Sequence, residues 1–424
     1  MADELAGCVS RHARTLAPVP GVLPDGEPVP ATGELPATAL ARAGERGFGV
    51  YVHIPFCASR CGYCDFNTYT AAELAGGVTR ESYADLVLAE IALSKRVLDG
   101  VKAPVETVFF GGGTPTLLPA ADLGRILHAV DDAFGLAPGA EVTTEANPES
   151  VDPAYLRELR AAGFTRVSLG MQSAARHVLA ILDRKHTPGR AVEAAREARE
   201  AGFEHVNLDL IYSTPGETAA DWDASLTAAI GAGVDHVSAY SLIVEDGTRL
   251  AGRVRRGELA VPDDDVAADR YLAADAALSA AGLGWYEVSN WAASEAARCR
   301  HNLLYWRGGD WWGYGPGAHS HVGGVRWWNA RHPSAYAARL AEGASPGHGR
   351  ELLSAEDEYI EDVLLRIRLA EGLPVSSLRA PGRHAATLAA ADGLLDSAAL
   401  ADGRAVLTLR GRLLADAVVR DLLP

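Results

Sequence analysis

The chain has 424 residues, of which 48% are hydrophobic and 22% are charged, and its formal net charge is −16. This composition is that of an ordinary globular protein and excludes a mostly disordered, collagenous or coiled-coil chain. The acidic balance argues against a nucleic-acid partner, because the average surface repels phosphate groups. The sequence contains no apolar stretch of about 18 residues, and charged residues stand where a secretory signal would be apolar. We therefore expect a cytoplasmic protein.

The chain begins with a proline-rich stretch. Residues 1–46 hold six prolines between positions 18 and 36, and they show little apolar periodicity. Such a composition is typical of an extended, weakly ordered segment. We predict a flexible extension that lies outside the fold.

From residue 47 to about 290, short β-rich segments alternate with longer amphipathic segments that have helical spacing. Repeated βα units predict a parallel sheet with crossover helices, either open or closed into a full or partial barrel. Ligands of such folds gather at the C-terminal ends of the strands. The expected strands are 48–54, 105–110, 140–146, 165–170, 205–212, 235–244 and 285–289, and the expected helices include 80–98, 152–162, 189–201, 218–232 and 264–281.

The pattern changes after residue 290. Residues 291–353 form an aromatic, glycine-rich segment in which we expect the βα alternation to stop. Residues 354–424 then predict a small C-terminal α+β domain of winged-helix-like type, beginning with an amphipathic helix at 354–372. Alternating charge signs along the last helix favour a solvated face over a DNA-binding surface.

Three cysteines follow the first expected strand with CxxxCxxC spacing: Cys57, Cys61 and Cys64. Three thiolates leave one position open, both in a four-coordinate zinc site and on a four-iron cluster. The spacing alone therefore leaves two interpretations. One is an iron-sulfur cluster with one uncovered iron, and the other is a zinc site completed by His53.

A glycine triplet ends the second expected strand, at Gly111–Gly113, and Thr114 follows it. Glycine lets a backbone adopt positive φ and approach a ligand closely, although the same pattern also occurs in tight turns. In combination with the cysteine spacing, this motif resembles the radical SAM superfamily. In that superfamily the CxxxCxxC loop holds a 4Fe-4S cluster, and a glycine-rich motif binds S-adenosylmethionine (SAM).

The resemblance is to the branch that contains oxygen-independent coproporphyrinogen III oxidase, and it covers roughly residues 48–420. It rests on the motifs YVHIPFC at 51–57, GGGTPT at 111–116, EANP at 145–148 and GMQS at 170–173, among others. It implies a partial (β/α) barrel over 47–290 and a cluster held by the three cysteines. By the same resemblance SAM contacts Tyr51, Gly112 and Glu145, and a second SAM is surrounded by Gly113, Thr114, Gln172, Arg184 and Asp209. From the residues alone, the two carboxylates and Arg184 could equally be structural groups.

Two features distinguish members of this branch. The oxidase carries a fourth cysteine two residues after the third, and here that position is Phe66. Residues 301–306, HNLLYW, resemble the HNxxYW motif of the heme chaperones in the same superfamily. This second resemblance implies a protein that binds heme and transfers it to acceptor hemoproteins of the respiratory chain. The alternative is an oxidase-type enzyme (coproporphyrinogen dehydrogenase) of porphyrin biosynthesis.

The heme motif nominates His301 as the axial ligand of heme iron, since histidine among aromatic residues suits that role. Cys299 is an alternative ligand, and a buried histidine with an ordinary hydrogen bond is the structural alternative. Asn302 is expected to hold the loop. The expected partners are heme and acceptor hemoproteins, whereas peripheral membrane association and a homodimer are left open. Candidates for pairing with heme propionates are Arg298, Arg300 and Arg307.

Overall fold

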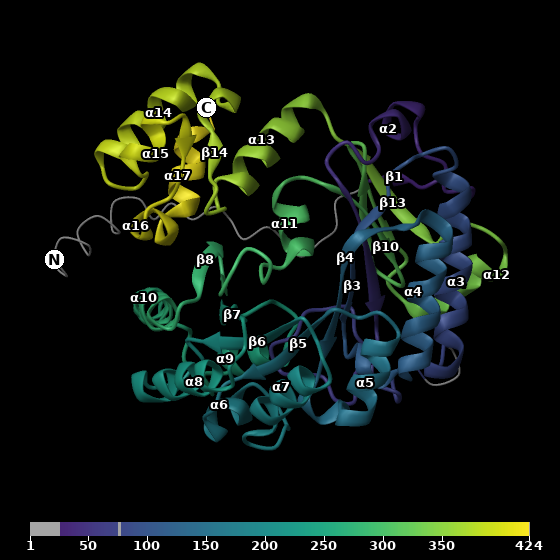
Figure 1. Cartoon of the computed structure of the whole chain (residues 1–424), viewed down its shortest axis with the longest axis horizontal. Coiled ribbons are helices and arrows are strands. Elements are labelled where there is room, and N and C mark those ends of the chain that lie inside the picture. Colours follow the sequence, from purple (N-terminus) through teal and green to yellow (C-terminus); the bar gives the residue numbers. More distant parts are fainter. Residues whose placement is uncertain (1–25, 75–77, 424) are drawn as a thin grey trace. The chain divides into compact units, whose positions relative to one another are not determined.

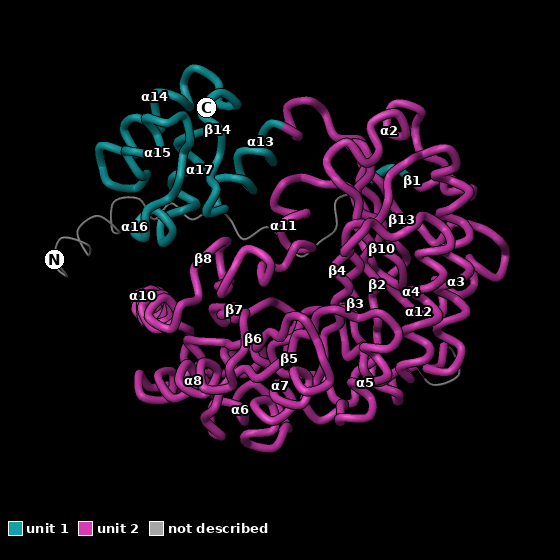
Figure 2. Tube along the Cα trace, viewed as in Figure 1, with its two compact units in different colours: residues 1–27, 359–424 teal, residues 28–358 magenta. Residues whose placement is uncertain are grey.

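The computed structural model describes residues 26–74 and 78–423. Two compact units divide the chain: Pro28–Glu358 and a smaller unit containing the described residues from Tyr359 onward (Figure 2). Residues 1–25 of the expected extension lie outside the described residues. The part from residue 26 differs from the expectation, since it forms β1 (Glu27–Pro28) and α2 (Ala37–Arg42). The Ala39 side chain is buried in the core of the large unit, which explains why this part is structured.

A sheet of 13 strands forms the large unit. Its central strands are parallel and neighbour one another in chain order. They are β2 (Phe48–Ile54), β3 (Val105–Gly112), β4 (Leu136–Ala146), β5 (Arg166–Gln172), β6 (His205–Tyr212) and β7 (His236–Ser241). The first six expected strands are thus confirmed as a parallel βα series.

Crossover helices connect these strands and lie along one side of the curved sheet (Figure 1). Two of them begin with a capping box, formed by Thr79 with Ser82 and by Thr218 with Asp221, in which the side chains satisfy free N–H groups of the first turn. The helices are α3 (Arg80–Val97), α4 (Ala120–Phe134), α5 (Pro153–Ala161), α6 (Arg176–Ile181), α7 (Arg190–Glu200), α8 (Ala219–Gly231), α9 (Arg249–Arg255) and α10 (Asp264–Ala280).

Side chains alternate along the parallel strands, and this alternation gives the sheet an apolar and a polar side. On β2, for example, Val50, Val52 and Ile54 belong to the hydrophobic core, whereas Tyr51 and His53 line a cavity. The other parallel strands repeat the pattern. The concave side of the sheet is therefore polar, and ligands can be bound there.

The two edges of the sheet differ from the expectation. The seventh expected strand is β8 (Gly284–Glu287), which pairs antiparallel with β9 (Asn290–Ala292) rather than extending the parallel series. At the other edge β10 (Asp310–Tyr314) lies parallel to β2, and the antiparallel strands β11 (His319–Val322), β12 (Val325–Asn329) and β13 (Gly347–Leu352) follow it. The aromatic segment therefore continues the sheet, with α11 (Arg300–Trp306) and α12 (Pro333–Ala341) beside it.

The sheet does not close on itself, because β1 and β8 are its two ends. This confirms the predicted partial barrel.

The smaller unit is α+β, with a two-stranded antiparallel sheet of β14 (Leu373–Pro374) and β15 (Arg404–Ala405). Its helices are the C-terminal part of α13 (Ala355–Arg366), then α14 (Ala380–Ala391), α15 (Ser397–Ala401), α16 (Leu409–Leu413) and α17 (Ala415–Leu422). No helix among residues 26–74 and 78–423 is long and apolar enough to cross a membrane.

Candidate functional site

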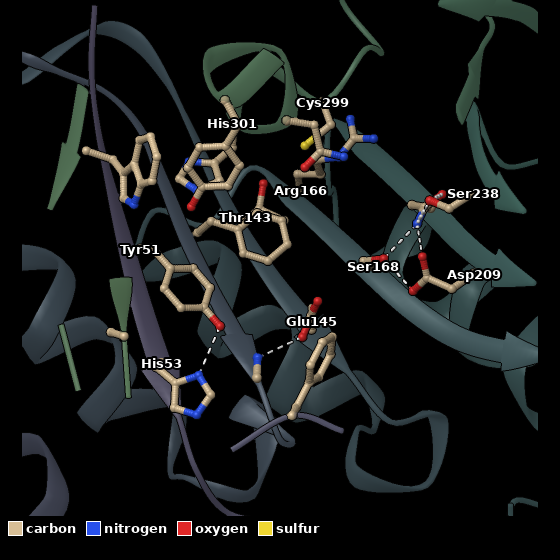
Figure 3. A pocket seen from close by; sticks show the side chains of 18 of the residues that line it. Tyr51, His53, Thr143, Glu145, Arg166, Ser168, Asp209, Ser238, Cys299 and His301 are labelled. Carbon is tan, nitrogen blue, oxygen red and sulfur yellow. Dashed lines mark hydrogen bonds between the residues drawn. The ribbon is translucent and has the colours of Figure 1, made fainter. Parts of the chain in front are cut away.

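Two adjoining cavities occupy the concave side of the sheet. The outer cavity has a volume of about 490 Å³ and is lined by the cysteine loop and the C-terminal ends of the strands. The inner cavity has a volume of about 500 Å³ and is lined by residues nearer the strand starts and by α11 (Figure 3). Six residues line both cavities: Phe66, Gly112, Glu145, Ser168, Asp209 and Tyr240.

The three cysteines of the motif all line the outer cavity, on the loop that follows β2. Backbone hydrogen bonds hold this loop, from Cys57 N–H to the Tyr69 carbonyl at 2.9 Å and from Cys64 N–H to the Cys61 carbonyl at 3.4 Å. Burial raises the pKa of the Cys57 thiol, and it raises that of Cys64 to about 11. A bound metal would supply the positive charge that makes these groups thiolates.

The zinc interpretation does not fit the position of His53. Its Nδ1 lies 3.0 Å from the Tyr51 hydroxyl and its Nε2 lies 2.9 Å from the Asn67 carbonyl, so both ring nitrogens are engaged. His53 is therefore not available to complete a zinc site with the cysteines. Three thiolates without a fourth protein ligand match the donor set of a cubane cluster with one uncovered iron.

The glycine triplet is required by the packing of the protein itself. Gly112 has a φ of +106°, and a Cβ added there would lie 2.5 Å from the His53 ring. A Cβ on Gly113 would collide with the Phe56 carbonyl. The Gly112 N–H donates to Glu145 Oε2 at 3.0 Å, which links the loop to the next strand (Figure 3). The sequence analysis ascribed these glycines to the approach of a ligand, whereas contacts within the protein already demand them.

Two buried carboxyl groups, Glu145 and Asp209, line both cavities. Burial raises the pKa of Glu145 to about 8, and the negative charge of Asp209 adds to the effect. Burial also raises the pKa of Asp209, although its oxygens accept hydrogen bonds from Ser168 at 2.7 Å and from Asn207 at 2.8 Å. A cationic ligand would stabilise the ionised forms of both groups. The site is thus suited to a ligand such as SAM, which carries a sulfonium and an amine.

The remaining residues proposed for the second SAM lie in the outer cavity with the cysteines. Arg184 donates from Nη2 to the Gly170 carbonyl at 2.9 Å and from Nη1 to Cys61 Sγ at 3.4 Å. Gln172 has a φ of +64°, a conformation that is uncommon outside glycine and concentrates at functional sites. The structure therefore brings together seven of the eight predicted SAM residues. Tyr51 is the exception, because it lines only the inner cavity.

His301 lies on α11 and is only 1% exposed. Its Nδ1 is 2.8 Å from Thr107 Oγ1, its Nε2 is 2.8 Å from the Tyr305 hydroxyl, and its ring stacks on Phe109 at a centroid distance of 5.1 Å. Burial lowers the pKa of His301 to about 3, so the imidazole is neutral. Neutral imidazole is the form that ligates metals, but heme iron would have to displace a hydrogen bond to reach it.

The heme motif and the cysteine loop lie at opposite ends of β2. A Cβ on Gly49, near the start of β2, would collide with Leu304 of α11, whereas Cys57 follows the strand's C-terminal end. Eight residues separate these positions, which at roughly 3.3 Å per residue is up to about 26 Å. Asn302 donates to Glu287 Oε1 at 3.4 Å, so it ties α11 to β8.

None of the three arginines proposed for heme propionates lines the inner cavity. Arg298 lies over the Tyr286 ring at 5.8 Å and pairs with Glu295 at 3.8 Å, and Arg300 donates to the Gly139 carbonyl. Cys299 does line the cavity, where burial and Glu141 raise the pKa of its thiol.

Several cavity residues were missed in the sequence analysis. They share a simple signal, since each is a polar or aromatic residue at every second position of an otherwise apolar strand. They are Arg166, Ser168, Asn207, His236, Ser238 and Tyr240.

Comparison with known proteins identifies the family of this chain. The family model "Radical SAM superfamily" matches residues 51–229. The curated heme chaperone HemW of Mycobacterium tuberculosis is 58% identical over 391 residues, which is 92% of this chain and 98% of that protein. Heme chaperone HemW of Escherichia coli is 34% identical over 77% of this chain and 83% of that protein. The solved structure of coproporphyrinogen III oxidase (HemN) from Escherichia coli, a radical SAM enzyme, matches with a TM-score of 0.76 at 24% identity, covering 91% of this chain and 92% of that one.

The fold and the cysteine loop thus define a radical SAM protein. The chain belongs to the radical SAM superfamily and, within it, to the family whose curated members are named heme chaperone HemW. The likeness to the oxidase structure extends to the fold alone.

Proposed function

We propose that this protein is a heme chaperone, which binds heme and passes it to acceptor hemoproteins of the respiratory chain. The observation that carries the proposal is the 58% identity to a curated heme chaperone over 98% of that protein's length. At this identity the fold and the main binding sites are generally retained. Phe66, at the position where the oxidase has its additional cysteine, supports the same choice.

The outer cavity would hold a 4Fe-4S cluster through Cys57, Cys61 and Cys64, with SAM at the uncovered iron. A reduced cluster supplies the electron that radical SAM chemistry requires. The chain's own contribution is electrostatic, since Glu145 and Asp209 offer two carboxylates to a cationic ligand. Arg184 would contribute positive charge, because its guanidinium lies beside Cys61 and would stabilise the thiolate form of that cysteine.

The inner cavity would take part in heme binding through His301. Aromatic side chains of Phe109, Tyr305 and Trp311 line it together with this histidine. Flat aromatic walls suit a porphyrin ring, and a neutral imidazole suits its iron. The two cavities share lining residues, but His301 and the cysteines lie near opposite ends of β2. We therefore expect loss of His301 to leave the cluster in place.

One alternative remains, a SAM-dependent oxidase of coproporphyrinogen III, which the oxidase-like fold makes worth testing. Anaerobically reconstituted protein should be incubated with coproporphyrinogen III, SAM and a reductant, and the products analysed by chromatography. The chaperone proposal predicts no SAM-dependent decarboxylation and stoichiometric heme binding by the same preparation. Robust formation of protoporphyrinogen would contradict the proposal and establish the alternative.

A further inference from the structure

A buried arginine in the inner cavity lacks a partner for part of its charge. Arg166 is the first residue of β5 and is 1% exposed. Its Nη1 donates to the Ala297 carbonyl at 2.7 Å, whereas its buried Nη2 has no hydrogen-bond partner. Leaving a charged donor unsatisfied inside a protein is costly, so such a group indicates that a partner is missing.

A neighbouring carboxylate does not supply that partner. Glu141 lies close enough to Arg166 to favour its charged form electrostatically. However, the Glu141 oxygens accept the backbone N–H groups of Arg300 and His301, each at 3.0 Å. Among the described residues, no carboxylate lies within ion-pair distance of Arg166.

A second unsatisfied donor stands beside the first. Thr143 of β4 is the direct neighbour of Arg166 in the β4–β5 ladder, and both side chains line the inner cavity (Figure 3). The Thr143 side chain is fully buried, and its hydroxyl oxygen also has no hydrogen-bond partner. Two independent buried donors thus face one cavity from adjacent strands.

We propose that Arg166 and Thr143 form a carboxylate-binding site for a ligand with a flat, apolar body. A guanidinium matches a carboxylate geometrically, and a threonine hydroxyl can donate a further hydrogen bond to it. The aromatic rings of Phe109, Tyr305 and Trp311 line the same cavity and provide contact for a flat body.

The charge of the cavity selects a monoanion. Glu145 and Asp209 line the same cavity, and their ionised forms would repel a doubly charged phosphate more strongly than a single carboxylate. Two ligands could supply this carboxylate: heme, through a propionate group, or a free aromatic carboxylate. Binding of heme rests on the proposed function, whereas binding of a free carboxylate does not.

The test is a calorimetric titration of cluster-reconstituted protein with benzoate, inorganic phosphate, heme and heme dimethyl ester. The wild type is compared with Arg166→Gln and Thr143→Val, and the matched control is Arg96→Gln, an exposed arginine on α3 that also donates to a backbone carbonyl. We expect Arg166→Gln to weaken benzoate binding by about tenfold or more, because a charge-assisted hydrogen bond is lost. Thr143→Val should weaken it severalfold, and the control should leave it unchanged.

Heme and its dimethyl ester distinguish the two sources. If a propionate occupies the site, heme binds more tightly than the ester in the wild type, and Arg166→Gln removes that difference. If benzoate binding depends on Arg166 while heme does not bind at all, the carboxylate site is supported and the proposed function fails.

If Arg166→Gln does not fold, Thr143→Val provides the test, since it keeps the shape of the side chain. Benzoate and heme affinities unchanged in Thr143→Val and in any folded Arg166 variant would overturn the proposal. Phosphate that binds as tightly as benzoate would also overturn the proposal.

Discussion

The Nε2 atom of His301 lies 2.8 Å from the hydroxyl oxygen of Tyr305, and the Nδ1 atom lies equally close to Thr107 Oγ1. The residue nominated as heme ligand is therefore hydrogen-bonded through both ring nitrogens. Both partners come from fixed elements, Tyr305 from the same helix and Thr107 from β3. Heme ligation by His301 must exchange one of these bonds for iron.

This relationship gives a prediction for Tyr305→Phe. Loss of the hydroxyl frees Nε2 for iron, so heme affinity should rise by about fivefold, the equivalent of about 1 kcal/mol for one hydrogen bond. His301→Ala should weaken heme binding and change the visible spectrum, while cluster absorption stays the same in both variants. Heme titration followed by absorption spectroscopy measures both effects. Unchanged affinity and spectrum in both variants would mean that His301 is structural.

The cysteine loop gives a second prediction. Cys57→Ala, Cys61→Ala and Cys64→Ala should each lose most of the about four irons and matching sulfides of the reconstituted protein, because each thiolate ligates a different iron. Cys299→Ala is the control, since that thiol lines only the inner cavity, and it should keep the full iron content. Iron and sulfide analysis decides the matter. Zinc in the native protein, or a full cluster in all three single variants, would contradict the assignment.

A third prediction concerns Gly112. Gly112→Ala should destabilise the protein more than Gly100→Ala, although both glycines have positive φ. At Gly100 an added Cβ meets nothing within 4 Å, so only the backbone cost of about 1 kcal/mol applies. At Gly112 the Cβ would also collide with the His53 ring, which adds about 1–3 kcal/mol. Equal free energies of unfolding in denaturant titrations of the two variants would show that the loop tolerates the side chain.

Glu145 gives a pH prediction. Its pKa in the fold is raised to about 8 from an ordinary value of 4.5, so the unfolded chain ionises first as pH rises. The stability associated with protonated Glu145 is therefore present below pH 4.5 and is lost as pH rises toward 8. Glu145→Gln lacks this loss, and its free energy of unfolding relative to the wild type should increase between pH 5 and about pH 8. A pH-independent difference between the two proteins would indicate that Glu145 titrates normally.

Much of the fold follows from local sequence patterns. The segments 48–54 and 205–212 show strand-like composition and match β2 and β6, because a strand buried between helices and a cavity must be rich in apolar and β-branched residues. The edges of the sheet were harder to predict. The pairing of β10 with β2 joins residues about 260 positions apart, and no local pattern encodes such a contact.

For a similar reason, only part of the site could be predicted from the sequence. The cysteines and the glycine triplet form short motifs with fixed spacing, so they can be recognised in the sequence. Arg166 and Thr143 lie on different strands and become neighbours only through the β4–β5 register. The arginines expected to pair with heme propionates were those close to His301 in sequence, whereas Arg166 is the arginine that lines the inner cavity.

The most direct test of the central claim is heme transfer to an acceptor. Protein loaded with one heme should be mixed with an apo-hemoprotein of the respiratory chain, and the acceptor's spectrum and activity followed over time. The chaperone account predicts that heme moves to the acceptor faster than it does from heme-loaded serum albumin, and that His301→Ala, loaded under the same conditions, delivers less. Heme that stays on the protein, or reaches the acceptor no faster than from albumin, would contradict the account.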